Sequence, residues 1–266
     1  MAVCHRRLSR DGCNQQDRRA PGARVTRPRD RAPDVRALIA GQPSLEGDMT
    51  GTVGGMQRLC RAAAGALSAT GVGVGLIGEG GVQVTVAAST APIERIEQLQ
   101  FSLGEGPCLE AYSTRRPVLV PDLRAAGATP WPAYAHAARD HGVRGVFAFP
   151  LQVGGARLGA MDVYRDTAGA LSRESLGLAL TFAEVATETI LDAQAEPGSR
   201  DQVLHDAGDY RYQVFQAQGM VMVQLGVTLA EAMARIRAHA YAHNRQLSDV
   251  AEDIIAGKLV LESDAP

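Results

Sequence analysis

The sequence predicts an α+β domain, built on an antiparallel sheet flanked by helices, followed by an all-α bundle of three helices. Strand-like runs come in pairs joined by short Gly-rich turns, with helical segments before, between and after them. The chain then ends in three segments whose apolar residues recur at helical spacing. A length of 266 residues is sufficient for both units.

The first 48 residues differ from the rest of the chain. They are rich in Arg, Asp, Pro and Gly, and they carry a net charge of +4, which leaves −6 on residues 49–266. Because little apolar surface offsets the ordering entropy, residues 1–48 are predicted to be a disordered basic tail. Two interpretations remain open. The tail is a basic arm for nucleic acid, or it is dispensable or translated from a mis-assigned start, with Met49 as the true initiator.

The sheet domain begins with a helix from Met56 to Leu67, where apolar residues recur at helical spacing. The runs 72–77 and 82–87 form a hairpin, since the second alternates and a Gly-rich turn joins the two. The following patterns predict a helix or turn over 93–99, a helix over 108–114, a strand over 118–120, a helix over 133–140, strands over 146–153 and 158–164, and a helix over 171–194 with Ser172 as N-cap.

The last three helices have their own boundary signals. The first spans about 209–225, and Gly226 follows it where a left-handed residue is wanted. Thr228 and Glu231 have the spacing of a capping box at the start of the second helix. The third presents an apolar stripe from Leu247 onward. Short links between such helices are typical of a small bundle.

Four segments of the sheet domain resemble, in their order, the GAF family of sensor domains: LGEGPCLEAY, RRPVLVPDL, WPAYAHAARDHGVRGVFAFPL and GGARLGAMDVY. The resemblance covers about residues 54–194. It implies a GAF-like antiparallel sheet and an unknown small-molecule or protein signal as the partner of this domain. Residues 195–208 are then expected to be a linker.

The C-terminal bundle, residues 209–262, resembles the ANTAR domain in the segments QAQGM, IRAHA, LxxVA and II. That resemblance implies an RNA-binding module that controls transcription by antitermination. The residues it places at the RNA, on outward faces of the helices, are Ala217, Gln218, Met222, Arg237, Tyr241 and Arg245. Gln218 stands where the family often has lysine. Arginine binds phosphate and tyrosine stacks on unpaired bases, but a solvated helix face has the same residue pattern.

A sensor pocket is expected near Cys108, Trp131 and Phe149. Cys108 follows a tight turn, so it is either a reactive thiol or a buried residue that starts a helix. His136 and His141 are open to the same choice between ligation and packing. The four cysteines form no C-x-x-C pair, and no catalytic constellation stands out. We therefore expect no enzyme activity, no cofactor and no metal.

The sequence as a whole indicates a cytoplasmic, signal-responsive RNA-binding antiterminator. No apolar segment reaches the length of a transmembrane helix and no secretory signal is visible, so no membrane partner is expected. The expected partners are structured RNA, in hairpin loops of nascent transcripts, and a second copy in a homodimer. We expect the helix over 171–194 to mask or present the bundle. The alternatives are a redox or cofactor sensor, a thiol enzyme, or a protein-interaction module without RNA binding.

Overall fold

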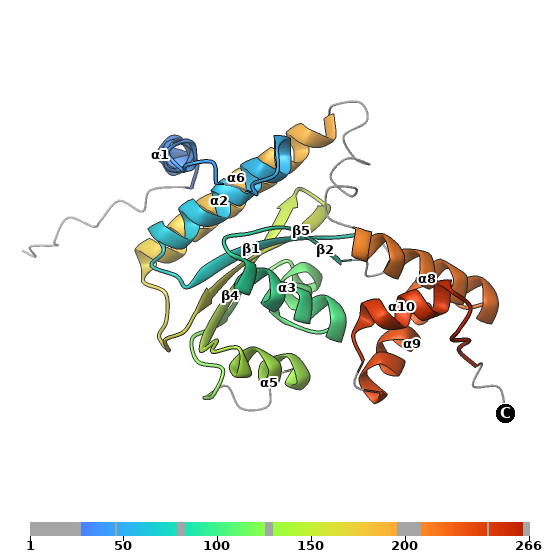
Figure 1. Cartoon of the computed structure of the whole chain (residues 1–266). Helices are drawn as coiled ribbons and strands as arrows, with labels where there is room; N and C mark the ends of the chain where they lie inside the picture. Colours follow the sequence, from blue (N-terminus) through green and yellow to red (C-terminus); the bar gives the residue numbers. More distant parts are fainter. Residues whose placement is uncertain are drawn as a thin grey trace, which may run out of the picture.

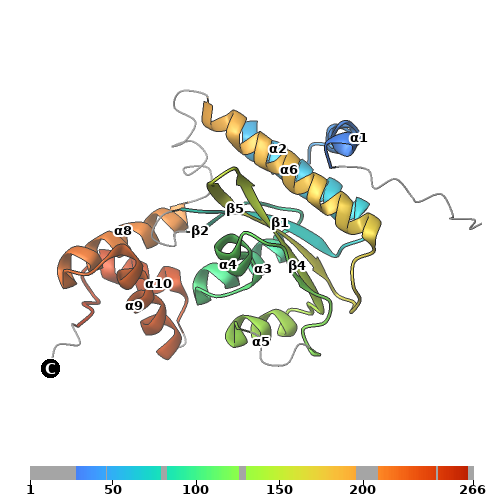
Figure 2. The same cartoon turned by 180° about the vertical axis from the view of Figure 1, so that it is seen from behind.

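The computed structural model describes residues 28–45, 47–78, 83–125, 130–195, 209–243 and 245–262. Its centre is an antiparallel five-stranded sheet with the strand order β2-β1-β5-β4-β3. Figures 1 and 2 show helices on both faces of this sheet and a further group of helices beside it. The strands are β1 (Gly71–Ile77), β2 (Gln83–Ala88), β3 (Val118–Val120), β4 (Gly145–Val153) and β5 (Ala156–Arg165).

Among the described residues, six helices belong to the sheet domain: α1 (Pro28–Ala40), α2 (Gly51–Ala66), α3 (Ala91–Leu103), α4 (Pro107–Thr114), α5 (Pro132–Asp140) and α6 (Arg173–Ala195). The helices α2 and α6 lie side by side on one face of the sheet, and α3, α4 and α5 cover the other (Figures 1 and 2). The predicted α+β architecture is therefore confirmed. The backbone N–H of Ser175 donates to Ser172 Oγ at 3.0 Å, as expected of an N-cap.

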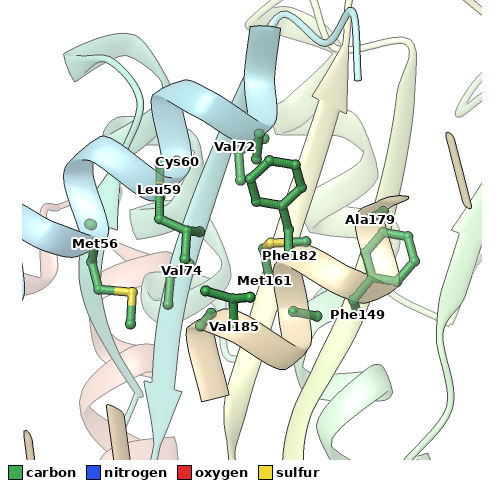
Figure 3. Close-up of a cluster of buried hydrophobic side chains, with 14 of the residues drawn as sticks. Met56, Leu59, Cys60, Val72, Val74, Phe149, Met161, Ala179, Phe182 and Val185 are labelled. Atoms are coloured by element: carbon green, nitrogen blue, oxygen red, sulfur yellow. The ribbon is translucent and has the colours of Figure 1, made fainter. Parts of the chain in front are cut away.

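The two faces of the sheet differ in chemistry because successive side chains of a strand point to opposite sides. On the face under α2 and α6, Val74 of β1 is paired with Met161 of β5, and Met161 with Phe149 of β4. Figure 3 shows these side chains packed with Met56 of α2 and Phe182 of α6. This face holds the main apolar core. The neighbouring positions on the same strands face α3, α4 and α5, and two of them, Asp162 and Tyr164 on β5, are polar.

The prediction of disorder for residues 1–48 is wrong for Pro28–Ala40, which forms the helix α1. Val35 is fully buried in the main core, Ala32 is nearly so, and Ile39 packs against them. The spacing of these three residues gives a narrow apolar stripe that α6 covers, while Arg36 pairs with Glu188 on α6. Contact with α6 therefore specifies this helix despite its charged composition. Residues 1–27 lie outside the described part of the chain.

The C-terminal bundle consists of α8 (Asp209–Leu225), α9 (Leu229–Ala242) and α10 (Leu247–Ile255). The predicted capping box is present at the start of α9, with Glu231 N–H donating to Thr228 Oγ1 and Thr228 N–H donating to Glu231 Oε2. Gly226 has the predicted left-handed conformation, with φ of 63°. The expected three-helix bundle is thus confirmed. Of the predicted linker over 195–208, all but Ala195, the last residue of α6, lies outside the described residues.

Within the described residues, no single helix is long and apolar enough to cross a membrane. The segments Tyr212–Leu225 and Leu229–Ala242 meet that criterion only as a pair, and the pair is bent by 108° at its break.

Candidate functional site

A set of polar side chains is buried between the sheet and the helices α3, α4 and α5. We call it the polar cluster, and its members are Gln83, Glu97, Gln100, Cys108, Tyr134, Asp162 and Tyr164. Each is at most 2% exposed, although polar residues of this kind are seldom fully buried without partners. They come from β2, α3, α4, α5 and β5. The fold thus brings together residues that are far apart in the sequence.

Gln100 on α3 is at the centre of this cluster. Its Nε2 donates to Asp162 Oδ2 at 2.5 Å and to Tyr164 Oη at 3.1 Å, and its Oε1 accepts from the backbone N–H of Cys108 at 2.9 Å. Gly106 lies against it, so closely that a Cβ at that position would collide with the amide. One side chain therefore ties α3 to β5 and to the start of α4.

Two carboxyl groups share the cluster. The Tyr164 hydroxyl donates to Glu97 Oε1 at 2.8 Å, and Asp162 Oδ2 lies 3.3 Å from the same hydroxyl oxygen. Gly73 on β1 makes room for Glu97, since any Cβ there would overlap the carboxylate. Burial raises the pKa of Asp162 to about 7, although hydrogen bonds from Gln100 and Tyr164 favour its charged form. Asp162 therefore gains or loses its proton near neutral pH.

Hydrogen bonding in the cluster is incomplete. Gln83 Oε1, Asp162 Oδ1 and Tyr134 Oη are buried and have no hydrogen-bond partner among the described residues. Such an atom costs about 1–3 kcal/mol relative to a satisfied one. Buried polar atoms of this kind are rare in native proteins, and a role in binding is one explanation for them. Gln83 Oε1 and Asp162 Oδ1 are acceptors and the Tyr134 hydroxyl can donate, so the cluster is suited to a polar group that donates hydrogen bonds and can also accept one.

Cys108 belongs to the polar cluster, as a residue that starts α4. Gln83 Nε2 donates to its sulfur at 3.0 Å. Burial first, and then the charges of Asp162 and Glu97, raise the pKa of the Cys108 thiol well above its usual value. Cys60 lies in the apolar core on the opposite face of the sheet, and burial raises its pKa as well. The thiols are therefore protonated and lie on opposite sides of the sheet.

Trp131 and Phe149, the other two residues of the expected pocket, lie on different faces of the sheet. Trp131 is buried at the start of α5, where its Nε1 donates to Glu110 Oε2 at 2.8 Å and its ring meets that of Tyr134 edge-on at 5.8 Å. It therefore borders the polar cluster. Phe149 packs in the main core beside Phe182 (Figure 3). Its place in the expected pocket is wrong, because β4 directs this position toward α2 and α6.

In the bundle, the expectation that Ala217 and Gln218 face outward is wrong. Both are buried, at 0% and 1% exposure, in the core formed by α8, α9 and α10. Gln218 Nε2 donates to the backbone carbonyl of Leu229 at 2.7 Å and so joins α8 to the first turn of α9. A helical face that looks polar in the sequence is here a buried bridge between helices. Met222 is half-buried and packs against the same core.

The remaining residues expected at the RNA have three different environments. Tyr241 is 74% exposed on α9. Arg245 forms an ion pair with Asp253 on α10, with 2.7 Å between its Nη2 and Oδ2. Arg237 lies over the ring of Phe101 on α3, with 5.4 Å between its Cζ and the ring centroid. Of these three side chains, Tyr241 is the one that is freely presented to a partner.

Sequence reasoning missed six members of the polar cluster: Gln83, Glu97, Gln100, Tyr134, Asp162 and Tyr164. One signal was available for Asp162, which occupies an otherwise apolar strand at a position that must be buried. For Glu97 and Gln100 the sequence shows only polar positions on an amphipathic helix. No group of three or more His, Cys, Asp or Glu side chains suited to hold a metal ion occurs among the described residues.

Comparison with known families and structures fits both units. A family model described as "GAF domain" matches residues 55–190, and one described as "ANTAR domain" matches residues 202–255. The chain is similar to the GAF domain of a phosphoenolpyruvate-protein phosphotransferase from Coxiella burnetii, with 14% identity and a TM-score of 0.48, over 63% of this chain and 95% of that one.

The chain is also similar to the free methionine-R-sulfoxide reductase from Neisseria meningitidis, solved in complex with its substrate, with 18% identity and a TM-score of 0.43, over 62% of this chain and 91% of that one. A search of curated proteins finds no match.

Proposed function

The chain belongs to the GAF-domain family and carries a C-terminal ANTAR domain, and we propose that it is a signal-responsive regulator that binds structured RNA and controls transcription by antitermination. The observation that carries this proposal is the capped three-helix bundle, which lies almost wholly within the residues that match the ANTAR domain. The sheet domain supplies the response to a signal. The location that fits this activity is the cytoplasm, where nascent transcripts are made.

We propose that RNA binding depends more on the stacking of bases than on the attraction of phosphates to a positively charged surface. Residues 209–262 carry a net charge of −1, so the bundle as a whole does not attract phosphates. The exposed ring of Tyr241 is suited to an unpaired loop base, and Met222 and Arg245 lie on the same small domain. Arg237 completes the proposed contact once it is free. Hairpin loops with unpaired bases are therefore the proposed target.

The signal is proposed to act at the polar cluster. Three unpartnered polar atoms, the acceptors Gln83 Oε1 and Asp162 Oδ1 and the Tyr134 hydroxyl, favour a small polar ligand that donates hydrogen bonds and can also accept one. Trp131 and Tyr134 give the cluster an aromatic border. A thiol-based activity is a weaker candidate, because the thiolate is the nucleophile and both Cys60 and Cys108 are held as buried thiols on opposite faces of the sheet.

A homodimer is part of the proposal, and a specific surface supports it. Tyr212, Met220 and Val223 are exposed large hydrophobic residues whose spacing places them on one face of α8. Exposed apolar side chains grouped in this way are typical of an interaction surface. The same surface would serve a protein-interaction module that does not bind RNA. Selection of RNA distinguishes these two functions.

The test is selection of RNA by the purified full chain from a library of paired hairpins with random loops, with Tyr241→Ala as the matched variant. We expect loop sequences to be enriched, and the selected RNA to bind at least about tenfold more tightly than a loop-scrambled version. Tyr241→Ala should lose about 1–3 kcal/mol of binding, the usual contribution of one stacked base. Equal binding of selected and scrambled RNA, unchanged by the substitution, would refute the proposal.

A further inference from the structure

The sheet domain and the bundle meet at the C-terminal end of α3. Phe101, which is 3% exposed, packs in the apolar core of the bundle, with Val214 on α8 and Ile236 on α9. Its ring also meets that of Phe215 edge-on, at 6.3 Å between centroids. A residue of the sheet domain therefore completes the core of the bundle.

Arg237 is held at this junction. Its guanidinium lies over the Phe101 ring, and it also lies against Gly104, where an added Cβ would come within 2.8 Å of Nη1. Gly104 ends α3 with a φ of 68°, a conformation that glycine adopts without strain. The absence of a side chain at this position thus permits both the end of the helix and the approach of the arginine.

The environment of Arg237 is unfavourable for a cation. Its Nε is buried without a hydrogen-bond partner, and no ion pair with it is found in the described ranges of the chain. Loss of water lowers its pKa to about 10. Contact with an aromatic face compensates only in part for this loss. The arginine would therefore gain hydrogen bonds and a counter-charge on moving from this junction to an RNA phosphate.

The helix α3 connects this junction to the polar cluster. Glu97, Gln100, Phe101 and Gly104 follow one another along a single stripe of the helix, at the spacing of neighbours. The first two contact Tyr164 and Asp162 inside the sheet domain, and the last two contact Arg237. A change in the hydrogen bonds of Gln100 would thus act on the residue next to it, Phe101.

We propose that the C-terminal end of α3 is a latch that withholds Arg237 from RNA, and that a change at the polar cluster opens it. The proposal rests on the proposed RNA-binding function. It places the regulated contact between α3 and α9. The residue that it controls, Arg237, is part of the proposed RNA contact. Opening the latch leaves the bundle folded, because Thr228, Gln218 and the rest of its core are held by contacts within the bundle.

The test measures the affinity of the full chain for the selected paired-hairpin RNA, by fluorescence anisotropy, in variants of the latch. Phe101→Leu keeps an apolar side chain but removes the aromatic face, and Gly104→Ala pushes against Arg237 itself. Phe147→Leu is the control, since Phe147 lies 5.7 Å from Arg165 Cζ in a comparable pair that does not touch the bundle.

Reactivity of Arg237 with phenylglyoxal, read by peptide mass spectrometry against exposed Arg116, reports the latch directly.

We expect Phe101→Leu and Gly104→Ala to bind the RNA about tenfold more tightly than the wild-type chain, as for a chain that is open one-tenth of the time. Phe147→Leu should stay within about twofold of wild type, Arg237→Ala should weaken binding, and Arg237 should become reactive in both latch variants. If the folded variants bind with wild-type affinity, the latch is wrong and RNA binding stands.

A wild-type Arg237 as reactive as Arg116 would also overturn the latch, even if neither latch variant folds. If no chain binds the RNA, the proposed function fails, and the latch fails with it.

Discussion

Asp162 is the residue of the polar cluster whose protonation changes near neutral pH. It occupies a strand position that faces the polar cluster, and burial raises its pKa to about 7. Glu97, Tyr134, Tyr164 and Cys108 are the other titratable groups around it, and none of them is a cation. The folded chain therefore keeps a proton on Asp162 at a pH where the unfolded chain has lost it. A donor that reaches this carboxylate would replace that proton.

This protonation predicts the direction of a pH effect on stability. Between about pH 4 and pH 7 the folded state binds more protons at Asp162 than the unfolded state, so its contribution to stability falls as pH rises. Each unit of pKa shift corresponds to about 1.4 kcal/mol. We expect Asp162→Asn to be more stable than wild type at pH 7.5, by several kcal/mol, and to gain little at pH 4.5. Urea denaturation at the two pH values measures this difference.

Asp122 provides the control of opposite sign. A hydrogen bond from Arg144 holds the pKa of its carboxyl below the usual value, so its contribution is present above the unfolded-state pKa and is lost as pH falls. Asp122→Asn should therefore be destabilised near neutral pH and approach wild type in acid. A gain from Asp162→Asn that is the same at both pH values would contradict the assignment.

At the scale of elements, the capping box of α9 gives the bundle one of its sharpest boundaries. Thr228 Oγ1 and Glu231 Oε2 satisfy backbone amides that the helix cannot satisfy itself. We expect Thr228→Ala to cost about 1 kcal/mol of bundle stability. Gln246 is at the matching position of α10 but makes no capping hydrogen bond, so Gln246→Ala should cost little. Thermal unfolding of the full chain compares the two, and equal losses would count against the cap.

The helix α1 allows a second comparison between matched positions. Val35 is buried against α6, whereas Leu38 on the same helix is 45% exposed. Removal of two buried methyl groups by Val35→Ala should destabilise the sheet domain by about 2 kcal/mol. Leu38→Ala should leave the free energy of unfolding within about 0.5 kcal/mol. Chemical denaturation gives both values. If Val35→Ala is neutral, α1 does not pack on α6 in solution.

What the sequence predicts well at this scale is local. The hairpin of β1 and β2, the N-cap at Ser172 and the capping box at Thr228 each depend on residues close together in the chain, and each is found. The helix α1 was missed because its apolar stripe has only three residues, and its burial depends on contact with α6. The arginine-rich composition of this segment predicts disorder, and three apolar residues are too few to change that prediction. Its stability is tertiary, and tertiary contacts overrule propensity.

At the scale of the whole molecule, the two units are joined through α3. Most of the polar cluster was not predictable because its residues come from five elements, and, apart from Cys108 and Asp162, each one alone carries no signal of a buried site. Gln218 and Arg237 were expected to contact RNA because the resemblance to the ANTAR domain placed them on outward faces of the helices. Gln218 is a bridge inside the bundle, and Arg237 is half-buried over the ring of Phe101. The expectation that α6 masks or presents the bundle remains a prediction. The contact of α3 with Arg237 joins the sheet domain to the bundle directly, without α6.

The proposed function requires that this chain bind hairpins in a transcript and prevent termination. The most direct measurement is single-round transcription on a template with the selected paired hairpins upstream of a terminator, with the wild-type chain or Phe101→Leu added. We predict more read-through with Phe101→Leu than with wild type, and none of this gain on a template with scrambled loops. Unchanged read-through with both chains, on a template whose RNA they bind, would contradict the account.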